Sequence, residues 1–263
     1  MRKADPDFEW KTPIEFYGQV VDQFGNAVEG ATVDCSWTTV VGPSPDPERK
    51  ILSETNGLFS ITGIRGKYLC LEVDKEGYRR TGTSHGGFEY ANFSNGDFYV
   101  PDSKKPVIFR LHKVTEAQPL TLFGPAGSLF AGTPLTLEVD TGKIAEDGDI
   151  SLAFVLGPGP GQYGPDYQIV LQASGGAGFV VTDEEFPSLA PEAGYQTALA
   201  LKVSASDSHY ERRKNIHFYV RTRTGRYAVI GLVVDIPPKG ITGHFEAGIR
   251  FNPSGSRNLE LGL

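Results

Sequence analysis

The sequence predicts an all-β protein that folds as two consecutive β-sandwich domains. Its 263 residues are long for one domain and comfortable for two. The 32 glycines and 18 prolines occur with 16 phenylalanines and 11 tyrosines, a mixture of turn-forming and strand-forming residues that is typical of many short strands. We find no window with apolar residues at helical spacing over three turns, whereas alternating apolar runs recur between turn residues.

The first half of the chain contains alternating runs that predict six strands. They lie at residues 15–22, 31–41, 50–55, 58–64, 67–74 and 106–113. Asn56-Gly57 between two of these runs is a strong hairpin signal. Residues 79–104 are polar, glycine-rich and aromatic, so we expect them to form one long excursion from the sandwich. A short linker at 115–119 would then separate a first domain, 1–114, from a second domain, 115–263.

The second half has the same β character with a different pattern. Eight strands are predicted, at residues 119–123, 134–139, 150–156, 168–173, 197–204, 216–222, 227–235 and 245–251. Residues 157–164, GPGPGQYG, are so rich in glycine and proline that we expect only a loop there. Because this half does not repeat the first closely, we expect a separate β-sandwich.

Four glycine-containing motifs stand in the first domain: GQVVD at 18–22, VEGATV at 28–33, TNGLFSI at 55–61 and KEGY at 75–78. As a set they resemble the carboxypeptidase regulatory-like, or transthyretin-like, domain family over residues 15–114. Ala27 departs from the family pattern, which commonly has proline there. The polar tail at 252–260 is similar to that of secreted bacterial proteins that carry the same first domain.

The resemblance implies a transthyretin-like sandwich for residues 15–114, and the similarity of the tail implies an exported bacterial protein. With the second sandwich expected above, the fold class is two consecutive β-sandwiches of the immunoglobulin or transthyretin kind. Members of the family serve as folding aids, spacers or recognition modules, and none of the matching residues is catalytic in the family. An extracytoplasmic location follows, whether secreted, periplasmic or at the cell surface. The opening segment MRKADPDFEW has no apolar core, so we expect no signal peptide within this chain.

The charge balance narrows the classes of partner. The net charge of −7 comes without any basic block, which disfavours nucleic acid, since phosphate contacts need clustered lysine and arginine. No apolar run approaches the ~18 residues that a membrane span requires. The partners left to consider are carbohydrate, which aromatic loops could bind, and an envelope protein, which the resemblance implies.

The two cysteines fall on opposite faces of their predicted strands. Cys35 shares the apolar parity of Val33 and Trp37 and should face a core. Cys70 alternates with Leu69 and Leu71 and should face away from it. Two separate thiols are therefore favoured over a disulfide, although an oxidising compartment would permit one.

The sequence contains no recognisable catalytic, metal-binding or cofactor-binding motif. None of the five histidines has metal-ligand spacing, and no Gly-x-Ser-x-Gly segment occurs. His85, in Ser84-His85-Gly86-Gly87, is the histidine with a plausible functional place, because loops often carry function. The acidic groups at 146–149 and 183–185 could offer oxygen ligands to calcium, but solvated turns are the simpler interpretation.

Aromatic residues in two glycine-rich segments complete the candidate ligand-binding set. Besides His85, the set contains Phe88, Tyr90, Phe93, Tyr163 and Tyr167. Exposed rings of this kind could stack on a sugar or on a partner chain. The alternative, which we favour, is that the rings anchor long loops to the sandwich.

These observations lead to three hypotheses about function. The first is a non-catalytic extracytoplasmic binding or interaction module that recognises carbohydrate or a partner protein through aromatic loops. The second is a structural spacer or assembly component of an envelope complex. The third and least favoured is a carbohydrate-active hydrolase that uses loop carboxylates, because no motif supports it. We therefore predict that the protein is not an enzyme.

Overall fold

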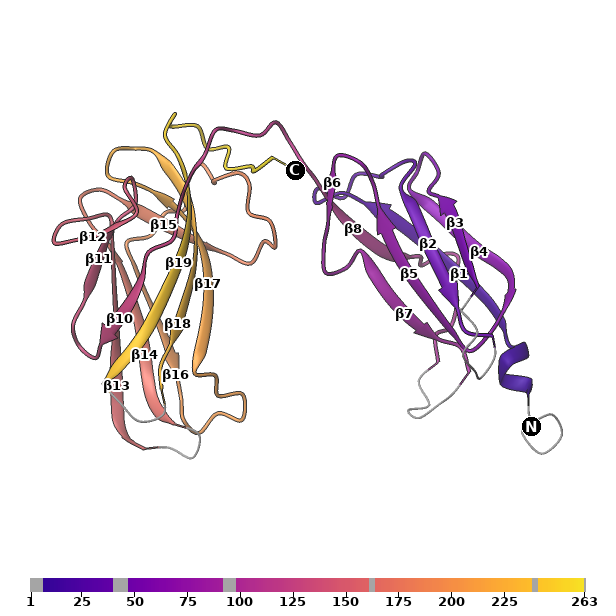
Figure 1. The fold of residues 1–263 in the computed structure, drawn as a ribbon, viewed down its shortest axis with the longest axis horizontal. Coiled ribbons are helices and arrows are strands. Elements are labelled where there is room, and N and C mark those ends of the chain that lie inside the picture. Colours follow the sequence, from indigo (N-terminus) through magenta and orange to yellow (C-terminus); the bar gives the residue numbers. More distant parts are fainter. Residues whose placement is uncertain (1–6, 40–46, 92–97, 161–163, 238–240, 263) are drawn as a thin grey trace. The chain divides into compact units, whose positions relative to one another are not determined.

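The computed structural model describes residues 7–39, 47–91, 98–160, 164–237 and 241–262. The regular elements of these residues are strands, preceded by one short 3-10 helix, η1, at Phe8–Lys11 (Figure 1). The chain divides into two compact units, Met1–Val114 and Thr115–Gly262, here called unit 1 and unit 2. The predicted fold class, all-β with consecutive β-sandwiches, is confirmed.

Unit 1 is built from two four-stranded sheets. Their strand orders are β4-β1-β8-β6 and β3-β2-β5-β7. All strand pairs are antiparallel except β1 and β8, which run parallel. The strands are β1 Pro13–Val21, β2 Thr32–Trp37, β3 Glu48–Leu52, β4 Leu58–Arg65, β5 Tyr68–Asp74, β6 Tyr78–Arg80, β7 His85–Glu89 and β8 Val107–Lys113.

Phenylalanine rings fill the centre of unit 1. Phe16 on β1 is fully buried, and its ring lies 6.0 Å from that of Phe59 and 6.1 Å from that of Phe109. Gly18, opposite Phe59 on β4, makes this packing possible, because a Cβ there would come within 2.2 Å of the Phe59 ring. Gly57 begins the returning strand with φ +76, a conformation that favours glycine.

The segment expected to be a single long excursion contains two strands, which corrects the sequence-based expectation. β6 pairs with β8, and β7 pairs with the edge of β5 over five residue pairs, from Tyr68↔Glu89 to Glu72↔His85. The segment HGGFE lacks the apolar alternation that marks a strand. It becomes one because the exposed backbone edge of β5 supplies hydrogen-bonding partners that no local pattern reports.

Unit 2 is also a pair of sheets. One has the order β10-β19-β18-β17-β15, with β9 also on β19, and the other has the order β12-β11-β13-β14-β16. The strands are β9 Thr121–Phe123, β10 Ala126–Phe130, β11 Leu135–Glu138, β12 Lys143–Ala145, β13 Ile150–Pro160, β14 Pro165–Ala173, β15 Gly178–Thr182, β16 Ala198–Val203, β17 Arg213–Arg221, β18 Tyr227–Asp235 and β19 Thr242–Asn252.

The core of unit 2 lies between its two sheets. Phe154, Phe179, Phe218 and Phe245 are fully buried there among aliphatic residues. Strands β10, β12 and β15 were not predicted, since they are short and two of them contain glycine. The predicted loop 157–164 was partly wrong: β13 continues to Pro160, which pairs with Pro165 beyond an irregularity in the ladder.

Candidate functional site

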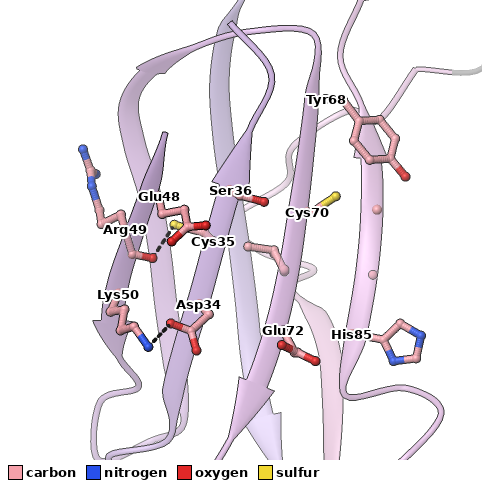
Figure 2. Close-up of a pocket in the computed structure, with 13 residues that line it drawn as sticks. Asp34, Cys35, Ser36, Glu48, Arg49, Lys50, Tyr68, Cys70, Glu72 and His85 are labelled. Atoms are coloured by element: carbon pink, nitrogen blue, oxygen red, sulfur yellow. Dashed lines mark hydrogen bonds and ion pairs between the residues drawn. The ribbon is translucent and has the colours of Figure 1, made fainter. Parts of the chain in front are cut away.

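The outer face of sheet β3-β2-β5-β7 carries a row of ionisable side chains. Alternate residues of each strand point away from the core, and the register aligns them across the sheet. Lys50 on β3 lies opposite Asp34 on β2, Asp34 lies opposite Glu72 on β5, and Glu72 lies opposite His85 on β7. One row of polar groups therefore crosses all four strands (Figure 2).

This row forms part of a shallow groove of 640 Å³. Its other lining residues include Ser36, Glu48, Tyr68 and Cys70, with Gly86 and Gly87 from β7. Tyr68 is 38% exposed, and Figure 2 shows its ring beside β7. A Cβ at residue 87 would lie 1.8 Å from the Tyr68 hydroxyl oxygen, so the phenol occupies the space above Gly87.

Ion pairs hold both carboxylates of the row. Lys50 Nζ lies 2.9 Å from Asp34 Oδ1, and the hydrogen bond with Asp34 raises the pKa of Lys50 above its ordinary value. Arg80 on β6 pairs with Glu72 at 2.5 Å and with Asp74 at 3.3 Å. A cation therefore orients the carboxylate of Asp34 and that of Glu72 through one oxygen each, and both side chains still line the open groove.

The two cysteines lie on opposite sides of the sheet, as predicted. Cys35 is buried and its Sγ donates to the carbonyl oxygen of Arg49 at 3.1 Å. Burial raises the pKa of the Cys35 thiol, so thiolate formation there is disfavoured. Cys70 is exposed and lines the groove, and the two thiols are not bonded to one another.

Of the six predicted ligand-binding residues, His85 lies in this groove. Phe88 is turned to the opposite face, with its ring 4.6 Å from that of buried Phe16. The Tyr90 hydroxyl donates to the Glu15 carbonyl oxygen at 2.6 Å, and its ring lies 5.6 Å from that of Tyr99. These two rings attach β7 and the residue that follows it to the core of unit 1.

The other described candidate, Tyr167, is a core residue of unit 2. It is only 3% exposed. Its hydroxyl donates to the Glu211 carbonyl oxygen, its ring packs on Tyr210 at 6.2 Å, and burial raises its pKa. Phe93 and Tyr163 lie outside the described residues. The described aromatic candidates Phe88, Tyr90 and Tyr167 thus pack against the core of the unit to which each belongs.

Sequence reasoning missed most of the groove residues. Tyr68 and Glu72 alternate with Leu69, Leu71 and Val73 along β5, and Asp34 alternates with Val33 and Cys35 along β2. This parity was the available signal, since it places polar residues on one outer face. It could not reveal which strands are neighbours, and that decides which side chains meet.

The acidic groups considered for calcium have structural partners. Asp149 is buried and accepts hydrogen bonds from the backbone N–H groups of Val139, at 2.9 Å, and Arg223, at 2.8 Å. Glu184 accepts the Tyr219 hydroxyl at 2.8 Å. The interpretation as solvated turns is therefore wrong for Asp149, which joins two loops. Within the described part of the chain, no three His, Cys, Asp or Glu side chains are grouped to hold a metal ion.

Unit 2 carries two smaller depressions. One of 410 Å³ lies on β17, β18 and β19, where His217, Gly231 and Gly248 form its floor and Leu122 and Val229 contribute apolar walls. The other, of 270 Å³, lies beside the interior of β13, where β14 begins and β16 ends. Neither combines an exposed aromatic ring with a row of charged side chains.

Among the described residues, no helix has the length and apolar character needed to cross a membrane.

Comparison with known proteins gives no family assignment. No family model matches the sequence, and no curated protein matches it. A streptococcal ancillary pilin is similar in structure with a TM-score of 0.27 and 13% identity, over 76% of this chain and 61% of the pilin. The chain thus spans less than two thirds of that pilin. A candidate carbohydrate binding protein from Bacteroides uniformis ATCC 8492 has a TM-score of 0.25 and 7% identity, over 90% of this chain and 98% of that protein. Similarities this low assign no function.

Proposed function

We propose that this protein is a non-catalytic extracytoplasmic binding module that recognises carbohydrate on the outer face of sheet β3-β2-β5-β7. One observation carries the proposal. The exposed ring of Tyr68 borders a 640 Å³ groove whose other lining groups include Asp34, Glu72 and His85. An aromatic face beside several polar groups is the combination that a sugar ring requires.

The chemistry of the groove suits hydroxyl groups. Each sugar hydroxyl can donate one hydrogen bond and accept others. The carboxylates of Asp34 and Glu72 accept hydrogen bonds, the Lys50 ammonium donates, and His85 can do either according to its tautomer. The Tyr68 ring supplies an apolar surface for the C–H face of a sugar. Because Lys50 and Arg80 orient the carboxylates before a ligand arrives, less side-chain freedom is lost on binding.

The charge of the groove also separates this ligand class from nucleic acid. Asp34, Glu48 and Glu72 line it together with Arg49, Lys50 and His85, so no cationic surface is formed. Polyanions bind to clustered lysine and arginine. An uncharged glycan, or one with basic groups, is therefore the favoured ligand. The extracytoplasmic location rests on the resemblance of residues 15–114 and is tested by fractionating cells of the source organism.

Glycan-array binding of the full chain tests the proposal. We expect binding that Tyr68→Ala and His85→Ala each reduce at least tenfold. Phe24→Ala serves as the matched control, since Phe24 is a 72% exposed ring of unit 1 that does not line the groove. Absence of glycan binding, or binding that survives Tyr68→Ala, contradicts the proposal. Cleavage of a bound glycan would replace it with the hydrolase alternative.

An assembly component is the second candidate function, and a different observation supports it. Strand β16 is the last strand of its sheet in unit 2, and no other strand of the described residues pairs with its outer edge. Such edges pair with strands of other chains. This candidate does not require the groove of unit 1, so the two functions can be tested separately.

A further inference from the structure

Strand β16, Ala198–Val203, is the last strand of the sheet β12-β11-β13-β14-β16, and among the described residues it has a strand partner on one side only. It lies in the orange part of Figure 1. Its register with β14 is continuous from Tyr167↔Val203 to Gln172↔Ala198 without a bulge. Regular pairing on one side leaves a regular row of backbone groups on the other.

The direction of each backbone group follows from one hydrogen bond. The N–H of Ala173 on β14 donates to the carbonyl oxygen of Thr197 at 2.8 Å, so residue 197 directs its backbone groups toward β14. Direction alternates along a strand. Leu199, Leu201 and Val203 therefore face β14, whereas Ala198, Ala200 and Lys202 direct their N–H and C=O groups outward.

Edge strands β3, β6, β12 and β15 have features that discourage pairing, whereas β16 carries a single charge, Lys202, near its end. Edge strand β3 has consecutive charges at Glu48, Arg49 and Lys50, while β6 and β12 are three residues long. The end of β15 is occupied, because Gln196 exchanges hydrogen bonds with Phe179. β16, with the sequence ALALKV, contains no proline, glycine or acidic residue. A regular apolar edge of this kind is a site for strand addition.

The side chains of β16 alternate in a way that suits an added strand. Leu199, Leu201 and Val203 are half-buried at the margin of the core of unit 2. Ala198 and Ala200 are exposed on the outer face and are small, so a neighbouring strand can approach. A further strand would complete the burial of the leucines, which favours association by the hydrophobic effect.

We propose that β16 pairs antiparallel with β16 of a second copy of this chain, with Ala200 at the two-fold axis. This register matches the outward-directed residues of one copy with those of the other: Ala200 faces Ala200, and Ala198 faces Lys202 of the second copy. Each matched pair exchanges two N–H···O=C hydrogen bonds. Leu199 meets Leu201 of the second copy, so the two cores become continuous.

The distribution of charge supports a second copy as the occupant. In this register the two Lys202 side chains lie opposite alanines and not opposite each other. The adjoining outward positions of β14, Gln168, Val170 and Gln172, are uncharged. β16 and these positions of β14 therefore hold no acidic side chain. Like charges placed directly opposite would destabilise the pair, and this register avoids them.

Sedimentation velocity of the full chain tests the pairing. An edge of six residues buries less area than a standard interface. We therefore expect a weak dimer, with a dissociation constant of about 1 μM or higher. Ala200→Pro should abolish the dimer, because proline removes the outward N–H while leaving the hydrogen bonds to β14 intact. Ala200→Ser, which keeps the N–H, is the matched control and should still dimerise.

Disulfide trapping tests the register in a Cys70→Ser background. Ala200→Cys should cross-link with itself on oxidation, because the two Cα atoms would be about 5.5 Å apart. Ala198→Cys should not, since the two residues 198 would lie about 13 Å apart along the strands. A monomer at the highest concentration reached, a dimer unaffected by Ala200→Pro, or equal cross-linking of both variants would each overturn the proposal. None of these readouts involves glycan binding, so they are independent of the groove in unit 1.

Discussion

The Tyr68 hydroxyl lies directly above Gly87, and a Cβ at residue 87 would come within 1.8 Å of its oxygen. β5 and β7 are neighbours, with Cys70 opposite Gly87 and Tyr68 opposite Glu89. The ring of Tyr68 therefore lies over β7 at Gly87, which has no side chain to obstruct it. The position of the one exposed ring in the groove depends on this glycine.

Gly87→Ala should therefore displace the Tyr68 ring and weaken glycan binding. We expect at least a fivefold loss of affinity, with little change in unfolding, because β7 is an edge strand of its sheet. Titration calorimetry with an array-selected glycan measures the effect. Gly124→Ala is the control, since a Cβ there meets no atom within 4 Å. Unchanged affinity in Gly87→Ala would show that the ring position does not matter for binding.

Phe88→Ala should lower the stability of unit 1 without affecting the groove. The ring of Phe88 lies 4.6 Å from that of Phe16 and 5.0 Å from that of Tyr99, so its removal leaves a cavity. We expect a loss of about 2–3 kcal/mol in the free energy of unfolding. Tryptophan fluorescence during urea unfolding measures it, because both tryptophans, Trp10 and Trp37, belong to unit 1.

His85→Ala provides the contrast in the same assay. His85 is exposed, so its removal should change the free energy of unfolding by less than about 0.5 kcal/mol. Should Phe88→Ala abolish glycan binding while leaving the urea midpoint unchanged, Phe88 would be a ligand contact and not an anchor of its segment.

The two thiols should react at very different rates. Cys70 is exposed, whereas Cys35 is buried and burial raises its pKa. A thiol reagent at neutral pH should label Cys70 alone in the native protein and both cysteines after denaturation. Cys70→Ser should eliminate the native labelling. Rapid labelling of two thiols in the native wild-type protein would mean that the sheet of Cys35 opens readily.

Alkaline pH should destabilise unit 2 through its half-buried and buried tyrosines. Burial raises the pKa of Tyr195 to about 12 from 10.0, and it also raises the pKa of Tyr167 and Tyr219. A folded-state pKa above the unfolded value means that the stabilisation is present below pH 10 and is lost as the pH rises toward 12. Phenolate absorbance and circular dichroism over this range measure the change.

Tyr195→Phe should reduce that alkaline loss of stability, because phenylalanine cannot ionise. The Tyr195 hydroxyl donates to the Pro191 carbonyl oxygen at 2.9 Å, so the variant also loses one hydrogen bond at every pH. The informative quantity is therefore the slope of the free energy of unfolding against pH. An unchanged slope between pH 10 and pH 12 would contradict the assigned role of Tyr195.

Asp149→Ala should destabilise unit 2 strongly. Its carboxylate accepts the N–H groups of Val139 and Arg223, and both donors would lose their partner. The expected loss is about 2–4 kcal/mol, measured by thermal unfolding followed in the far ultraviolet. Asp147→Ala is the control, because the side chain of Asp147 is 86% exposed although it pairs with Arg223. Equal effects of the two substitutions would contradict a structural role specific to Asp149.

The candidate site could be predicted only in part. His85 was identified from its place in a glycine-rich segment, and it does line the groove of unit 1. Phe88 and Tyr90 belong to the candidate set as rings that could be exposed, but both pack against the core of unit 1, which agrees with the favoured interpretation that such rings anchor their segments. Aromatic rings gain free energy wherever they are buried, and sequence spacing in irregular segments does not tell which face they meet.

Alternation along single strands is what the sequence by itself determined. It placed Cys35 inside and Cys70 outside, and it separated Tyr68 and Glu72 from the apolar residues of β5. The reason is local: side chains of a strand alternate between two faces with a period of two residues. The same local rule identified the all-β class and most of the strands.

Which strands lie side by side was decided only by the tertiary structure. The pairing of β5 with β7 places His85 opposite Glu72, and the parallel pairing of β1 with β8 adds β8 to the sheet that contains the chain's first strand. These contacts join residues far apart in the chain, and the backbone groups that make them are the same in every residue. Their choice depends on how whole sheets bury their apolar faces together, and no short segment carries that information.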